Sequence, residues 1–175
     1  MVLIEGEAMA AGHSESLIQD LALLHTLGVR LVLVFGIRPQ VNAALVQEGI
    51  TPRLEEGRWV ADDAIMARVE RIAAEQRLWF EARLSLGLPN TPLHGIELTA
   101  VSGNLVMAKP LGVRNGLDFA RSGEVRRVRA EAIDALLEQG SLVLLPPLGF
   151  SSTGEVFDLD AAEVAQQAAV ALGAD

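Results

Sequence analysis

The residues best placed for chemistry form the turn Gly36-Ile37-Arg38-Pro39, which directly follows the apolar run LVLVF at 31–35. An uninterrupted apolar run of this length is typical of a parallel strand that helices cover on both faces. Gly36 lets the backbone leave the sheet closely, and Pro39 suits the first turn of a helix. Ligands of open α/β sheets bind beyond the carboxyl ends of the strands, so this turn is a candidate binding site. An ordinary strand-to-helix connection would have the same sequence pattern.

Other reactive side chains are scarce. The chain contains no cysteine, which excludes disulfides, thiolate catalysis and cysteine-bound zinc. Its three histidines, His13, His25 and His94, are too far apart in sequence to form a metal motif, so we predict no metal site. Lys109 is the only lysine among 14 basic residues. Chemistry that needs a lysine beside a phosphate therefore has a single candidate.

The overall charge restricts the possible partners. The 175 residues include 23 acidic and 14 basic side chains, which give a net charge of -9. An acidic balance argues against nucleic acid and anionic membranes as partners, since both are bound mainly through basic patches. No apolar run approaches the ~20 residues that a membrane span needs, and Met1 leads directly into VLIEG without a basic region or cleavage site. We expect a cytoplasmic protein.

The chain alternates apolar strand-like runs with helical patterns, which is typical of an α/β fold. The first strand–helix–strand unit predicts parallel pairing, and the short strands in the second half suggest antiparallel hairpins added to the parallel sheet. Glu5-Gly6-Glu7 is expected to be a turn. The predicted strands are 2–4, 31–35, 96–101, 105–108, 124–128, 141–145 and 156–158, with a hairpin over 50–60. The predicted helices are 15–27, 39–47, 62–86, 130–139 and 161–172.

Helical spacing also predicts which side chains are buried. In the helix over 15–27, the apolar stripe is Leu17, Ile18, Leu21, Leu24 and Leu27. In the helix over 62–86, the buried stripe is Ile65, Val69, Ile72, Leu78, Trp79 and Phe80. The arginines and glutamates of that long helix alternate at spacings that favour a solvated face of ion pairs. The chain begins with a strand at residue 2 and stops after a helix with no strand to follow, which predicts a piece of a longer protein.

Several short runs, in order along nearly the whole chain, match one family. They are DLALLHTLGVRLVLV (20–34), GIRPQ (36–40), NTPL (90–93), VSGN (101–104), PLGV (110–113), SGEVRR (122–127) and TGEVFDL (153–159). The sequence resembles the amino acid kinase family, and within it the kinase-like domain of bacterial N-acetylglutamate synthases. The resemblance implies a three-layer α/β/α sandwich with a mainly parallel sheet and appended β-hairpins. It also implies that residues 1–175 are the N-terminal part of such a domain, without its C-terminal lobe or an acetyltransferase domain.

The related N-acetylglutamate kinases carry three catalytic elements that this sequence lacks. Their Lys-Leu-Gly-Gly turn corresponds to Leu3-Ile4-Glu5-Gly6, where a carboxylate replaces the cation. Their His-Gly-Gly turn corresponds to Phe35-Gly36-Ile37, which keeps one glycine. Their late Asn-Val-Asn-Ala-Asp motif corresponds to 158–162, which ends in Ala162. Negative charge beside a phosphoryl group opposes its transfer, so the resemblance implies that no residue of this chain is catalytic.

The same comparison predicts an altered amino-acid pocket. Where the family has Gly-Leu-Arg-Val-Thr-Asp, this chain has GRWVAD at 57–62, so that Trp59 takes the position of the arginine that grips the substrate carboxylate. Arg58 then lies on the opposite face of an extended segment. The residues that would remain in such a vestigial pocket are Gly36, Ile37, Arg38, Arg58 and Asp158.

The resemblance also implies a function. In the synthases this domain binds arginine as a feedback inhibitor and builds a ring-like homo-oligomer, while a separate domain transfers acetyl from acetyl-coenzyme A to glutamate. We therefore expect no cofactor in this chain, and arginine as an allosteric ligand of the full-length protein. Two alternatives stay open: an active kinase of the N-acetylglutamate kinase type that uses unusual residues, and an oligomerisation scaffold without a ligand.

Overall fold

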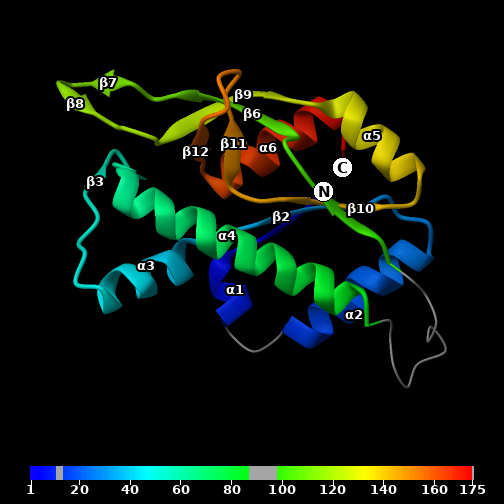
Figure 1. Ribbon diagram of the computed structural model, residues 1–175. Helices are drawn as coiled ribbons and strands as arrows, with labels where there is room; N and C mark the ends of the chain where they lie inside the picture. The colour runs from blue at the N-terminus through cyan, green and yellow to red at the C-terminus, as the bar shows by residue number, and fades with distance from the viewer. Residues whose placement is uncertain (11–13, 87–97, 175) are drawn as a thin grey trace.

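A four-stranded parallel sheet forms the centre of the molecule (Figure 1). The computed structural model describes residues 1–10, 14–86 and 98–174. In spatial order the strands are β1 (Val2–Ile4), β2 (Val32–Phe35), β10 (Leu142–Leu145) and β5 (Ala100–Ser102). The strand predicted over 31–35 is therefore an inner strand, with every residue of β2 buried.

The central strand faces two separate cores. Leu33 and Phe35 belong to a core that includes side chains of α2, α3 and α4, whereas Val32 and Val34 belong to a core with side chains of α5 and α6. This alternation explains why no polar residue interrupts the strand, because neither face reaches water. Helices on both faces give the predicted three-layer α/β/α sandwich (Figure 1).

The helices begin and end at residues whose chemistry suits those positions. Asp62 accepts a hydrogen bond from the backbone N–H of Ile65 at 2.9 Å, which caps α4. Asp160 caps α6 through the N–H groups of Ala162 and Glu163, and Gly173 ends that helix with a φ of 57°. The bounds are α1 Gly6–Ala10, α2 Ser14–Thr26, α3 Arg38–Gln47, α4 Asp63–Leu84, α5 Ala130–Glu138 and α6 Ala161–Leu172.

A second sheet and two small hairpins complete the described part of the fold. The second sheet runs in the order β12 (Val156–Asp158), β11 (Leu148–Phe150), β6 (Val106–Pro110) and β9 (Gly123–Val128). Strands β6 and β9 pair antiparallel, as predicted, but β5 joins the central sheet parallel to β10 rather than forming a hairpin. The hairpins are β3 (Leu54–Glu55) with β4 (Arg58–Trp59), and β7 (Val113–Arg114) with β8 (Leu117–Asp118).

Two local predictions are wrong. Glu5-Gly6-Glu7 is not a simple turn, because Gly6 starts the short helix α1, where Glu7 suits the positive first turn and Ala8, Met9 and Ala10 favour helix. The predicted apolar stripes are too wide: Leu24 of α2, Leu27 just after α2 and Leu78 of α4 are exposed, Leu27 to 71% and Leu78 to 56%. Ile18, Leu21 and Phe80, from the same predicted stripes, are buried in one core.

Some predictions fall outside the described residues. The NTPL run, His13, His94 and the first part of the strand predicted over 96–101 lie there. Among the helices that the structure describes, none combines the length and the apolar character needed to cross a membrane.

Candidate functional site

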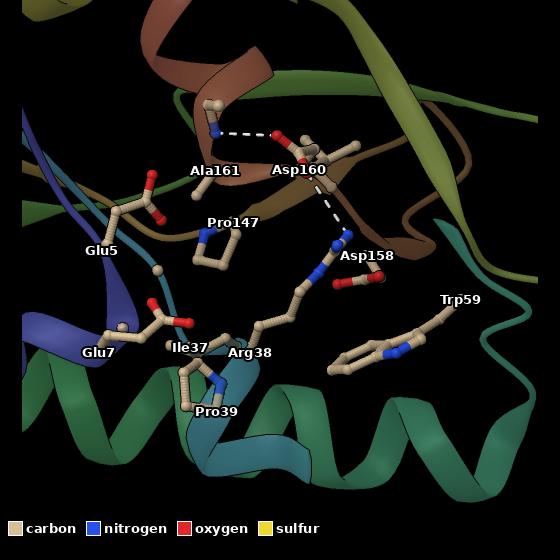
Figure 2. Close-up of a pocket in the computed structure, with 14 residues that line it drawn as sticks. Glu5, Glu7, Ile37, Arg38, Pro39, Trp59, Pro147, Asp158, Asp160 and Ala161 are labelled. Atoms are coloured by element: carbon tan, nitrogen blue, oxygen red, sulfur yellow. Dashed lines mark hydrogen bonds and ion pairs between the residues drawn. The ribbon is translucent and has the colours of Figure 1, made fainter. Parts of the chain in front are cut away.

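A pocket opens at the carboxyl ends of β1 and β2, where the sequence predicted a site (Figure 2). It encloses about 150 Å³, enough for several water molecules or a small ligand group. The turns after the two strands form one side, and the N-terminus of α6 forms the other. Its lining consists of Glu5, Gly6, Glu7, Gly36, Ile37, Arg38, Pro39, Trp59, Pro147, Asp158, Leu159, Asp160, Ala161 and Ala162.

Gly6 and Gly36 let the two strand-end turns touch. The N–H of Gly36 donates to the carbonyl of Ile4 at 2.8 Å, and the side-chain amide of Gln40 donates to the carbonyl of Gly6 at 2.8 Å. A Cβ atom on Gly6 would lie 2.5 Å from the Cδ of Pro39, and one on Gly36 would lie 2.9 Å from the N of Gly6. Both positions must therefore be glycine for the two turns to contact each other this closely.

Arg38 is the only basic residue in the pocket lining, and other groups already hold it. Its guanidinium lies over the ring of Trp59, 5.4 Å from the centroid, and donates to the carbonyl of Gly57 at 3.3 Å. It also forms an ion pair with Asp160 at 3.4 Å (Figure 2). The cation is thus partly neutralised within the protein.

Carboxylates outnumber this cation. Glu5, Glu7, Asp158 and Asp160 all line the pocket. Asp158 is buried, and burial raises its pKa to about 7, although Arg38 and Arg58 act to lower that pKa. The charge on Asp160 raises the pKa further. Near neutral pH the pocket therefore carries more negative than positive charge.

The predicted site residues separate into two groups. Gly36, Ile37, Arg38 and Asp158 come together in the pocket, but Arg58 does not line it. Arg58 forms an ion pair with Glu163 of α6 and donates to the carbonyl of Gly123 at 3.4 Å, which joins the hairpin to α6 and β9. A ligand role for these five residues stays a prediction.

Trp59 and its neighbour Arg58 face opposite sides of an extended strand, as the sequence predicted. The Trp59 side chain is buried and forms a wall of the pocket, whereas the neighbouring Arg58 points elsewhere. Glu7 and Pro147 also line the pocket, and neither was predicted. Pro147 follows the buried strand β10 much as Gly36 follows β2, so comparing the two strand ends could have found it.

Ser122 holds the backbone around Trp59 in place through two hydrogen bonds. Its buried hydroxyl donates to the carbonyl of Trp59 and accepts from the N–H of Ala61 at 3.0 Å. We expect Ser122→Ala to lower the free energy of unfolding by about 1–2 kcal/mol, because a buried donor and a buried acceptor lose their partner. Chemical denaturation measures this loss. The control is Ser85→Ala, which removes an exposed serine hydroxyl and should change stability by much less; equal losses in both variants would contradict the assignment.

Lys109, the only lysine, lies away from the pocket. It stands on β6, and its Nζ is 2.9 Å from Oε1 of Glu124 on β9. The hydrogen bond from Lys109 is the main reason that the pKa of Glu124 is below its ordinary value. No lysine therefore reaches the strand ends.

Comparison with known proteins then decides the family. The sequence profile of the amino acid kinase family matches residues 4–175. The chain belongs to the amino acid kinase family. The match covers nearly all of its length, in agreement with the parallel sheet and the three layers described above.

Within this family, the chain is similar to amino-acid acetyltransferases. It is 43% identical over 175 residues to the enzyme from Shewanella oneidensis and 45% identical to one from Pseudomonas fluorescens. The chain spans 39% and 40% of the length of these relatives. It is thus an amino acid kinase-like domain related to part of these longer proteins.

Solved structures agree with the sequence comparison. N-acetylglutamate synthase from Neisseria gonorrhoeae, complexed with coenzyme A and L-arginine, is 33% identical with a TM-score of 0.91 over 98% of this chain and 40% of its own. A Streptococcus mutans protein with a TM-score of 0.79 is 22% identical, which shows a shared fold alone.

Proposed function

We propose that this chain is the non-catalytic, kinase-like domain of an N-acetylglutamate synthase, in which it serves arginine feedback regulation and oligomer assembly. Its similarity to longer amino-acid acetyltransferases supports the first part. The similarity to a synthase complexed with L-arginine supports a role in arginine regulation. The role in oligomer assembly rests on the family resemblance alone. The observation that carries the proposal is the charge of the strand-end pocket.

Phosphoryl transfer needs positive charge where negative charge develops on the phosphate oxygens. This pocket presents the carboxyl groups of Glu5, Glu7, Asp158 and Asp160 against Arg38 alone, and Arg38 already pairs with Asp160. Gly36 is packed against the turn after β1, and its backbone N–H donates a hydrogen bond to the carbonyl of Ile4. That N–H is therefore not free to bind a phosphate oxygen. The lining therefore offers little positive charge to a nucleotide triphosphate, and the kinase alternative would have only Arg38, which already pairs with Asp160.

Acetyl-coenzyme A and glutamate would be handled outside this domain. We expect that chemistry in the part of the protein that corresponds to the remaining length of the relatives, of which this chain spans about two fifths. A scaffold without a ligand would share the fold and the charged pocket, and it differs from the proposal only in its response to arginine.

The test uses the whole natural gene product. We expect it to transfer acetyl from acetyl-coenzyme A to glutamate, and to do so at a rate that arginine changes. Calorimetry should detect arginine binding, and light scattering should give an oligomeric mass. Phosphorylation of N-acetylglutamate would overturn the proposal in favour of the kinase, and acetyl transfer without arginine binding would leave only the scaffold role.

A further inference from the structure

Asp158 is a buried acid to which the proposed function assigns no ligand. Only 7% of its surface is exposed, and its carboxylate forms no hydrogen bond or ion pair with any residue in 1–10, 14–86 or 98–174. Figure 2 shows the carboxylate pointing into the pocket, towards the side where Arg38 and Trp59 lie. A buried carboxyl group without a partner is costly in a folded protein, so this one calls for an explanation.

The charges around Asp158 favour a cation as its missing partner. The other charged groups of the lining come from four places: Glu5 follows β1, Glu7 is on α1, Arg38 is on α3 and Asp160 caps α6. Arg58 acts on Asp158 from β4, but its own ion pair is with Glu163. The negative charges inside the pocket therefore exceed the positive ones, and the Asp158 carboxylate is among those that form no ion pair with a described residue.

We propose that this pocket binds the ammonium group of a small organic amine, with the Asp158 carboxylate as its hydrogen-bond acceptor. An ammonium group presents three donors and forms strong charge-assisted hydrogen bonds with a carboxylate. Glu5 and Glu7, which also line the pocket, add attraction without needing direct contact. The proposal goes beyond the regulatory role and does not rest on it.

The residues that line the pocket suit an organic amine better than a metal ion. In the part of the chain that the structure describes, no group of three or more acidic or histidine side chains could hold a metal. Ile37, Pro39, Pro147 and Leu159 supply apolar surface beside the carboxylate, which suits a short hydrocarbon stem. The site therefore fits a ligand with one charged end and an apolar body.

Binding should depend on pH, because only the ionised form of Asp158 attracts an ammonium group strongly. The pKa of Asp158 is about 7, so its ionised fraction rises about tenfold between about pH 6 and pH 8. Apparent affinity should rise by a similar factor. Burial raises the pKa of Asp158, Arg38 and Arg58 lower it, and Asp160 raises it. Glu5 and Glu7 also line the pocket. None of these flanking groups is the one proposed to lose the proton.

The test is an NMR titration of the ¹⁵N-labelled full chain with n-butylammonium chloride at both pH values. We expect saturable shifts of pocket amides, and an affinity that Asp158→Asn weakens by roughly tenfold or more. The matched control Asp20→Asn removes the same charge from an exposed site on α2 and should bind as the unmodified chain does.

Three results would overturn the proposal. One is the absence of saturable shifts in the pocket. Another is equal affinity in the Asp158→Asn and Asp20→Asn variants, provided that their amide spectra show both to be folded. The last is the same pattern of shifts with neutral 1-butanol, which would mean that the pocket binds the apolar stem alone.

Discussion

Replacing Asp158 with asparagine should stabilise the protein at neutral and alkaline pH. The folded state raises the pKa of Asp158 from its ordinary value of 3.8 to about 7, chiefly through burial. Because the folded state holds the proton more tightly, the contribution of this group is fully present below about pH 4 and is lost as the pH rises towards 7. Asparagine resembles the protonated acid and does not titrate.

The expected gain grows with pH. Between about pH 5.5 and pH 8.5, the difference in unfolding free energy between Asp158→Asn and the unmodified chain should increase by about 2 kcal/mol in favour of the variant. Urea denaturation at several pH values measures it. Asp20→Asn serves as the control, since it removes the same charge from an exposed site, and an equal pH-dependent gain in both variants would contradict the assignment to Asp158. A variant less stable at alkaline pH would mean that the Asp158 carboxylate has a stabilising partner.

Replacing Phe80 with alanine should lower the free energy of unfolding by more than Ser122→Ala does. Phe80 is fully buried on α4, and its ring lies 5.3 Å from that of Phe35 and 5.1 Å from that of Trp79. We expect a loss of about 3–5 kcal/mol, since the variant loses the burial of the ring and leaves a cavity. Phe35 is the residue directly before Gly36, so the pocket turn should loosen as well.

The matched control for Phe80 is its neighbour Leu78. The Leu78 side chain is 56% exposed on the same helix, so Leu78→Ala should cost less than about 1 kcal/mol. Thermal or chemical unfolding of both variants gives the comparison. Similar losses in the two would mean that α4 packs with a different face towards the sheet.

The contrast between Phe80 and Leu78 shows what the sequence could predict. The apolar run at 31–35 has no polar residue on either face, so both its burial and its place in a parallel sheet follow from composition alone. Helical spacing gave the length of α4 but not the width of its buried stripe. That width depends on how far the sheet extends beneath the helix, which is a property of the tertiary structure.

The pocket was predictable where it follows a strand and unpredictable where it depends on packing between distant segments. Gly36, Ile37 and Arg38 were found because they end a recognisable strand, and Asp158 because its motif resembles one in the family. Glu7 was missed because its place in the pocket depends on the contact of Gly6 with Pro39 and Gln40 of α3, which joins segments distant in sequence. Arg58 was placed in the pocket because its sequence position did not reveal its partner Glu163 on α6.

The central claim is that a phosphate-handling site has become a carboxylate-lined pocket that cannot transfer a phosphoryl group. The most direct measurement is transfer of the labelled γ-phosphate of ATP to N-acetylglutamate by the full chain, beside an active N-acetylglutamate kinase. We predict no product above the enzyme-free background. Steady formation of acetylglutamyl phosphate at a rate comparable to that of the kinase, and its loss in Asp158→Asn, would contradict the claim.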